Sequence, residues 1–229
     1  MKTIASGPNF VYNLPNPSYD RGYMALRYII GIDEVGRGAL AGPVTVGVLA
    51  LKAGTRFDPA VLKDLKLHLR DSKRLTPRER ERWVSYLRKR DDIRFRVSSV
   101  APKTIDRINI SQAANLAATK AFKKLADREI LKTKPLVFLD GGLYLRGDWG
   151  KKLRVRTIIK GDEKIDAIKL ASIVAKVHRD RLMVHRHEKY PHYDFPKHKG
   201  YGTAHHMKKI KYHGLSEIHR KSFCRFMEV

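Results

Sequence analysis

The chain has 229 residues, 42% of them hydrophobic, and its 48 Lys and Arg outnumber 23 Asp and Glu for a formal net charge of +25. This composition predicts a soluble globular protein with a buried core, and no apolar run approaches the ~18 residues of a membrane span. A charge this positive favours a polyanionic partner, above all nucleic acid, over a small substrate. Charge alone leaves open a basic binding protein without catalysis, such as one associated with the ribosome.

The start of the chain predicts neither a domain nor an export signal. Residues 1–26 hold three prolines and two glycines without a helical or strand period, so we expect an irregular N-terminal extension. They lack the charged start, apolar centre and cleavage site of a secretory signal, and the single cysteine, Cys224, excludes an internal disulfide. We therefore expect a cytoplasmic protein.

The first strong element is an apolar run at residues 28–32 that ends in Asp33 and Glu34. A continuous apolar run bounded by glycines predicts a strand covered on both faces, with the two acids at its C-terminal end. Neighbouring strand residues face opposite sides, so both acids reach one site only if the backbone turns right after Asp33. Gly36 and Gly38 permit such a turn.

Strands and helices then alternate as in an α/β protein. Apolar patterning, turns and caps predict a strand at 44–51, a short amphipathic helix within 58–69, a helix from Pro77 to about Arg90, a strand at 93–98, and a longer helix capped by Thr104 and reaching Leu125.

The second half continues the pattern. It predicts a strand at 135–140, a strand at 154–160 ending at Gly161 and Asp162, a helix at 166–187 with His178, Arg179, Arg181 and Arg186 on its wetter side, and helices at 204–211 and 216–221. We therefore expect a five-stranded mixed sheet flanked by helices over residues 27–190, with a helical basic region, 191–229, packed on it.

Three strand ends each place an acid beside glycine: Asp33 with Glu34, then Asp140, then Asp162. Open α/β sheets place their chemistry at the carboxyl ends of strands, and oxygen ligands from several strands suit Mg²⁺ or Mn²⁺. One such acid alone is more simply a solvated strand end. Three in the same context favour a shared metal site.

Residues 31–44, Gly-Ile-Asp-Glu-Val-Gly-Arg-Gly-Ala-Leu-Ala-Gly-Pro-Val, closely resemble the signature of the ribonuclease HII family. Residues 171–177, Ala-Ser-Ile-Val-Ala-Lys-Val, resemble a family segment that follows its last catalytic Asp at this spacing, which selects Asp162 over Glu163 and Asp166. The chain departs from that pattern at 169–170, Lys-Leu, where the family usually has small residues. The resemblance covers roughly residues 28 to 223.

The resemblance implies an RNase H-like fold and a divalent-metal-dependent endoribonuclease. Such enzymes hydrolyse the RNA strand of RNA–DNA hybrids and nick 5′ of single ribonucleotides in duplex DNA, in ribonucleotide and RNA primer removal. It implies two Mg²⁺ or Mn²⁺ ions during catalysis, and we expect a monomer. The implied catalytic and metal-binding acids are Asp33, Glu34, Asp140 and Asp162.

Substrate contacts are also implied by resemblance. Gly36 and Gly38 would let the nucleic-acid backbone approach closely, and the Arg37 guanidinium offers two donors to a phosphate. A plain tight turn would explain the same residues. Residues 198–201, His-Lys-Gly-Tyr, resemble a family motif whose Tyr, here Tyr201, packs against a sugar; plain surface packing is the alternative. Residues 71–73, Asp-Ser-Lys, resemble another motif, which makes Ser72 and Lys73 candidate phosphate contacts.

Other functions stay open. A junction resolvase would use similar acids on a similar sheet, and a non-catalytic basic protein could keep the fold, although it would have no physical reason to keep four mutually repelling carboxylates. Zinc is disfavoured because no cysteine accompanies the histidines, and no nucleophile elbow indicates covalent catalysis. We expect the histidines to be solvated or phosphate-facing, in particular His185, His187, His192, His205 and His206.

Overall fold

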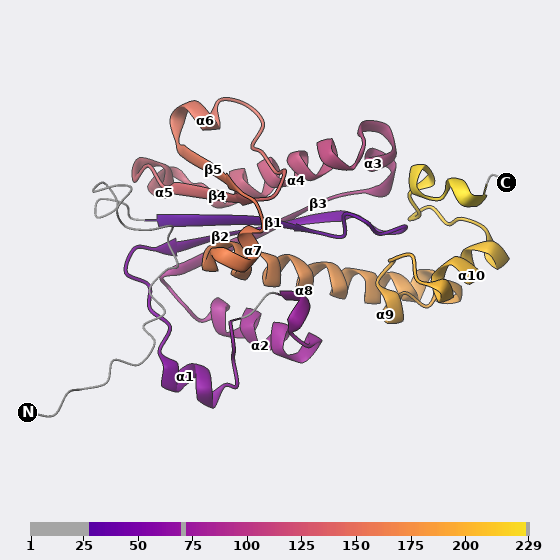
Figure 1. Cartoon of the computed structure of the whole chain (residues 1–229), viewed down its shortest axis with the longest axis horizontal. Helices are drawn as coiled ribbons and strands as arrows, with labels where there is room; N and C mark the ends of the chain where they lie inside the picture. The colour runs from indigo at the N-terminus through magenta and orange to yellow at the C-terminus, as the bar shows by residue number, and fades with distance from the viewer. Residues whose placement is uncertain (1–27, 70–71, 228–229) are drawn as a thin grey trace, which may run out of the picture.

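A computed structural model describes residues 28–69 and 72–227, so the extension predicted for residues 1–26 lies outside the described residues. A five-stranded mixed sheet in the order β3-β2-β1-β4-β5 forms the centre (Figure 1). β1 pairs antiparallel with β2 and parallel with β4. The α/β class with a five-stranded mixed sheet is thus confirmed. Its strands are β1 (Tyr28–Val35), β2 (Val44–Lys52), β3 (Ile93–Val100), β4 (Leu136–Asp140) and β5 (Arg154–Ile158).

Helices cover both faces of the sheet, which explains why β1 is apolar from Tyr28 to Ile32 (Figure 1). One face carries α1 (Pro59–Asp64), α2 (Pro77–Arg88) and α8 (Asp166–Lys189), and the other carries α3 (Pro102–Ile108), α4 (Ile110–Leu125) and α5 (Arg128–Lys132). Ile29 packs in the first core, and its neighbour Ile30 packs in the second. The alternating sides of one strand therefore supply two separate cores.

α8 packs directly against the backbone of the sheet where glycines face it. A Cβ added at Gly31 would lie 2.1 Å from the backbone of Ala167, and one at Gly47 would lie 2.3 Å from the Ala171 carbonyl oxygen. Substitution at either glycine would push α8 away from the sheet. The unusual Lys169 does not disturb this helix, since its ammonium pairs with Asp166 at 3.1 Å on the same helix.

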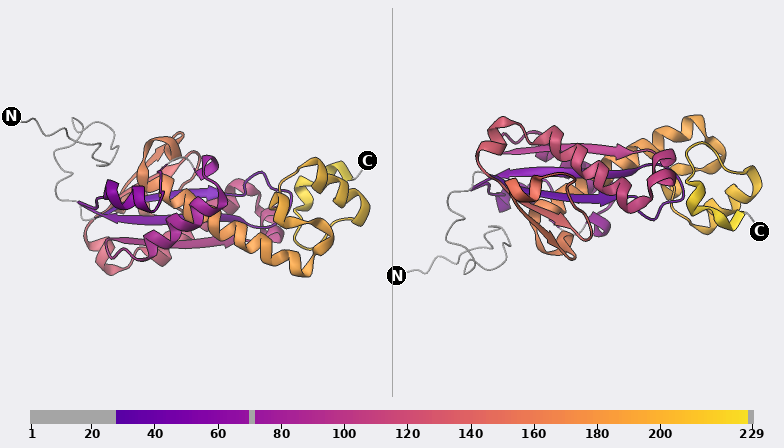
Figure 2. Two further views of the ribbon diagram at one scale, coloured as in Figure 1. Left: turned by 90° about the horizontal axis from the view of Figure 1, so that it is seen from below. Right: turned by 90° about the horizontal axis from the view of Figure 1, so that it is seen from above.

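The C-terminal residues form a cap of short elements beyond the end of the sheet, around the last turns of α8 (Figure 2). Two isolated β-bridges tie this part to the loop after β1, joining Ala39 to Tyr201 and Ala41 to His219. The remaining elements are α6 (Trp149–Lys152), α7 (Gly161–Lys164), α9 (Phe195–His198), α10 (Ala204–His213) and the 3₁₀ turns η3 (Ser72–Arg74), η4 (Pro191–Tyr193), η5 (Lys221–Phe223) and η6 (Arg225–Met227).

Two helix predictions were wrong. Thr104 is not a cap: α3 starts at Pro102, and α4 has its own cap, Asn109, whose side chain accepts a hydrogen bond from the Gln112 backbone N–H. Residues 216–221 are not a helix, because their backbone bonds to the loop after β1 instead. The Arg220 N–H donates to the Leu40 carbonyl oxygen at 2.8 Å.

Smaller differences have equally local causes. β5 ends at Ile158 rather than Lys160, since Lys160 adopts a left-handed conformation (φ 54°) that starts the turn α7. Arg179 was expected on the wetter side of its helix but is fully buried. Within the described ranges, no helix combines the length and apolarity needed to cross a membrane.

Candidate active site

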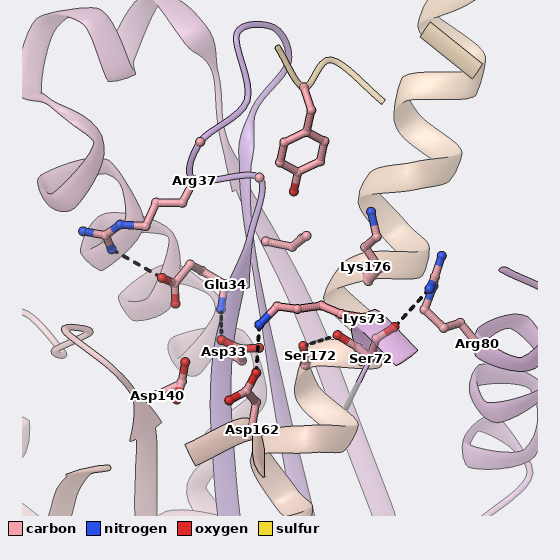
Figure 3. Close-up of a pocket in the computed structure, with 14 residues that line it drawn as sticks. Asp33, Glu34, Arg37, Ser72, Lys73, Arg80, Asp140, Asp162, Ser172 and Lys176 are labelled. Atoms are coloured by element: carbon pink, nitrogen blue, oxygen red, sulfur yellow. Dashed lines mark hydrogen bonds and ion pairs between the residues drawn. The ribbon is translucent and has the colours of Figure 1, made fainter. Parts of the chain in front are cut away.

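The carboxyl ends of β1 and β4 lie side by side and bring three acids together (Figure 3). One carboxylate oxygen each from Asp33, Glu34 and Asp140 lies within 4.8 Å of the others. The β1–β4 pairing ends at Ile32 opposite Leu139, so both β1 acids lie beyond the last pair, at an open strand end. The expected turn directly after Asp33 is absent, because β1 continues to Val35, yet Asp33 and Glu34 both reach one group.

Hydrogen bonds hold these acids in place, and one of them, to Glu34, comes from a charged group. Asp33 Oδ1 accepts the Glu34 backbone N–H at 2.7 Å, and Asp140 Oδ1 accepts the Gly161 N–H at 2.6 Å. Glu34 Oε1 accepts a hydrogen bond from Arg37 at 3.3 Å, whereas Glu34 Oε2 is buried and has no partner. A buried carboxylate oxygen without a partner is costly unless a cation or proton completes it.

The electrostatics agree with that geometry. Burial, then the charges of Glu34 and Asp140, raises the pKa of Asp33 well above its usual range. Burial is also the largest cause of the raised pKa of Glu34 and of Asp140. A divalent cation would favour the charged carboxylates by supplying the missing opposite charge. The three acids therefore suit Mg²⁺ or Mn²⁺, which both prefer oxygen ligands.

Asp162 lies beside this group rather than within it. It is buried at the start of α7, and its Oδ2 accepts a hydrogen bond from the Lys73 ammonium at 3.1 Å (Figure 3). The structure thus gathers three of the four predicted acids tightly and places the fourth on the same cavity in an ion pair.

A cavity of about 630 Å³ opens above the acids, and all ten residues singled out in the sequence line it. The acids lie on one side of the cavity, and Arg80 and Lys176 lie on the other (Figure 3). Arg37 and Lys73 contact the acid side through Glu34 and Asp162. An anionic substrate that reacts at a bound metal ion would fit this arrangement of charges. The lining comprises Asp33, Glu34, Val35, Gly36, Arg37, Gly38, Ser72, Lys73, Arg80, Asp140, Asp162, Ser172, Lys176 and Tyr201.

Comparison with known proteins fits this site. The sequence profile of the family Ribonuclease HII matches residues 30–226. A ribonuclease HII of Chlamydia caviae is 40% identical over 201 residues, which cover 88% of this chain and 86% of that protein. One of Caldicellulosiruptor bescii is 43% identical over 203 residues, 87% of each. The chain belongs to the ribonuclease HII family. It is accordingly a hydrolase of the ribonuclease H class.

Solved structures of the family share the fold. The ribonuclease H2 from Pyrococcus horikoshii OT3 matches with a TM-score of 0.63 and 26% identity, covering 88% of this chain and 97% of that one. The RNase HII from Archaeoglobus fulgidus, solved in complex with PCNA, matches with a TM-score of 0.61 and 26% identity, covering 87% and 94%. The expected RNase H-like fold is therefore confirmed.

Within this ribonuclease HII-family site, several predicted substrate contacts already have protein partners. The guanidinium of Arg37 donates to Glu34 and, at 2.9 Å, to the Ser111 hydroxyl. The Ser72 hydroxyl is buried and shares a 2.8 Å hydrogen bond with that of Ser172. The ring of Tyr201 makes cation–π contacts with two side chains: Lys176 Nζ lies 5.5 Å and Arg179 Cζ 5.2 Å from its centre.

Four lining residues were missed by sequence reasoning: the apolar Val35 and the polar Arg80, Ser172 and Lys176. Ser172 and Lys176 belong to the Ala-Ser-Ile-Val-Ala-Lys-Val segment, so that resemblance could have pointed to them. Arg80 gave no signal, because it lies in a run of alternating charges that reads as a solvated helix face. Its side chain is buried instead, and it donates to the carbonyls of Ser72, at 3.0 Å, and Leu75.

The histidines correct another expectation. His206 is not solvated but fully buried, and it packs against His198 and His219 in the C-terminal cap. Burial lowers the pKa of His206 to about 3 and that of His219 to about 4, so both are neutral. Among the described residues, the group of side chains placed to hold a metal consists of acids.

Proposed function

We propose that this protein cleaves the RNA strand of RNA–DNA hybrids and nicks duplex DNA on the 5′ side of single embedded ribonucleotides, leaving 5′-phosphates. The convergence of Asp33, Glu34 and Asp140 at the floor of a basic-walled cavity supports this proposal most directly. Membership of the ribonuclease HII family supports the choice of a hybrid substrate, and the net charge of +25 suits a polyanion.

Asp33, Glu34 and Asp140 would hold the metal, with Asp162 as a further ligand. Two bound Mg²⁺ or Mn²⁺ ions would supply an activated water and stabilise the oxygen that leaves. Asp33 and Asp140 are fixed by backbone N–H groups, so these acids need little reorganisation to bind a cation. Lys73 would partner Asp162 in the free protein and contact phosphate in the complex.

Selectivity for RNA requires a polar contact to the 2′-hydroxyl, which is the group that distinguishes the two sugars. The backbone of Gly36, Arg37 and Gly38 lines the cavity beside the acids and would make that contact. Tyr201 lines the same cavity and would pack its ring against the adjoining deoxyribose, which lacks the hydroxyl.

The test compares three labelled substrates at one Mg²⁺ concentration: a continuous hybrid, a DNA duplex with one ribonucleotide, and a four-way DNA junction. We expect cuts in the first two, a cut 5′ of the ribonucleotide in the second, and no cleavage when EDTA replaces Mg²⁺. Cleavage of the junction alone would contradict the proposal and favour a resolvase. Cleavage that persists in EDTA would contradict the metal assignment.

A further inference from the structure

Two arginines are completely buried where the C-terminal cap meets the loop after β1. Arg179 on α8 and Arg220 in the cap are both 0% exposed. In the part of the chain that the structure describes, each donates to backbone carbonyls and neither forms an ion pair with a carboxylate. Burying an arginine without a carboxylate partner is costly, so the carbonyl groups that accept its hydrogen bonds must offset that cost.

Arg220 holds the loop that carries Gly36, Arg37 and Gly38. Its Nη2 donates to the Gly36 carbonyl oxygen at 2.7 Å, its Nη1 to that of Arg37 at 2.8 Å, and its Nε to that of Gly42 at 3.0 Å. The planar guanidinium thus fixes two consecutive peptide groups at once, which a flexible ammonium cannot do in the same way.

Fixing these carbonyls also fixes the amide groups. In a planar trans peptide the C=O and N–H bonds point in opposite directions. The Gly36 carbonyl shares its peptide with the Arg37 N–H, and the Arg37 carbonyl shares its peptide with the Gly38 N–H. Because both carbonyls turn inward to Arg220, both N–H groups turn outward. Neither N–H donates a hydrogen bond to any described residue, and both residues line the cavity.

Arg179 secures the other side of the same loop. It donates to the carbonyls of Ala41 and Pro43 at 3.1 and 3.0 Å, and to that of Lys199 at 2.8 Å. Its side chain also fills the space beside Gly36, where an added Cβ would lie 2.1 Å from Nε. Gly36 has φ +83°, so this position favours glycine for its backbone as well.

We propose that Arg220 is a positioning residue for ribonucleotide recognition. It turns the N–H groups of Arg37 and Gly38 toward the substrate, where they read the 2′-hydroxyl and its neighbouring phosphate. This inference rests on the proposed function and assigns part of the specificity to a residue of the C-terminal cap that never contacts the substrate. Burial and the neighbouring Arg179 lower the pKa of Arg220 to about 9, so the group stays charged at neutral pH.

The variant that tests this is Arg220→Lys, which keeps the charge but loses the fork. It is made in an Asp140→Asn background so that bound substrate is not cut, and Arg181→Lys, at an exposed pair with Glu81, serves as the control. The measurement is the ratio of affinities for one duplex with and without a single 2′-hydroxyl. We expect Arg220→Lys to lower that ratio about tenfold while affinity for the all-DNA duplex changes little, and Arg181→Lys to leave it unchanged.

The outcomes separate the inference from the function beneath it. If the Asp140→Asn parent discriminates between the duplexes and Arg220→Lys discriminates equally well, the positioning role is wrong. If the parent does not discriminate, recognition by this loop fails and the inference falls with it. Should Arg220→Lys not fold, the amide resonances of Arg37 and Gly38 in Asp140→Asn decide the question. They shift more with the ribonucleotide duplex under this proposal, and equal shifts with both duplexes contradict it.

Discussion

The two regions around the cavity bury ionisable groups in opposite ways. At the strand ends, Asp33, Glu34 and Asp140 crowd together, and burial raises the pKa of each. In the C-terminal cap, Arg220 and His206 are buried more deeply than these acids, but backbone carbonyls accept their hydrogens. The three acids need a bound cation to balance their charge, whereas Arg220 and His206 have their hydrogen-bond partners within the protein. The first region is therefore suited to binding and reaction, and the second fixes the conformation of the loop after β1.

The largest effect should come from the acids. Asp33→Asn removes a charge from the group of three, so we expect a loss of roughly 10³-fold or more in kcat, with hybrid binding equal or tighter because less charge repels phosphate. Asp162→Asn should lose less, since it lies outside the tight group and water can replace it. Steady-state kinetics on a hybrid would check both, with Asp166→Asn as the control. A greater loss at Asp166 would show that the wrong acid was assigned.

Tyr201→Ala tests the substrate contact proposed for the C-terminal cap and should have a smaller, substrate-dependent effect. Loss of a ring that packs on the substrate costs roughly 1–3 kcal/mol, or about 5- to 150-fold. We expect that loss on a single embedded ribonucleotide and a smaller one on a continuous hybrid, which has no RNA–DNA junction at most of its sites. Equal losses on both substrates, measured at one Mg²⁺ concentration, would reduce Tyr201 to ordinary packing.

The pH dependence of the free energy of unfolding should report on the three crowded acids. A carboxyl whose folded pKa is raised contributes stability below its unfolded pKa, near 4, and loses it as pH rises through the folded value. Without divalent metal, the stability that the three acids contribute should therefore fall as pH rises above about 4, and the difference in melting temperature between the wild type and Asp33→Asn isolates that contribution. At pH 7 we expect Asp33→Asn to melt higher than the wild type, by roughly 2–4 °C per kcal/mol, and to gain less from added Mg²⁺. A lower melting temperature for Asp33→Asn would contradict the account.

The histidines of the cap predict the opposite pH dependence. The Tyr201 carbonyl can only accept, so His206 Nδ1 donates to it at 2.9 Å and Nε2 must accept from His219, 3.1 Å away. A proton on Nε2 would break this chain. Because the folded pKa values, about 3 and 4, lie below the unfolded value near 6.5, stability is present above pH 6.5 and is lost as pH falls.

Hydrogen exchange of residues 201–219 between pH 8 and 5 would check this loss, after correction for the intrinsic exchange rate. We expect protection to fall below about pH 6.5 in this segment, while β1 changes less. His206→Gln should flatten the response, and the exposed His185→Gln should leave it as in the wild type. Identical pH responses in the segment and in β1 would show that the histidines do not set it.

The sequence predicted the reacting end of the cavity better than the end that holds the loop. Asp33 and Asp140 each follow the apolar run of a strand, and the two strands are neighbours in the sheet, so the two side chains lie close together. The predicted strands were confirmed. The role of Arg220 depends on a long-range bond to Gly36, 184 residues away along the chain, which no local pattern encodes. Arg179 and His206 looked solvated for the same reason: a charged or basic run reads as surface until the tertiary partners are known.

Binding of Mn²⁺ tests the central claim most directly, because it does not depend on any substrate. Calorimetric titration of the wild type and Asp140→Asn at pH 7, with Asp166→Asn as the matched control, measures whether the three converging acids form the cation site. The account predicts binding to the wild type and to Asp166→Asn, and binding weakened at least tenfold in Asp140→Asn. Equal affinity in all three proteins would contradict it.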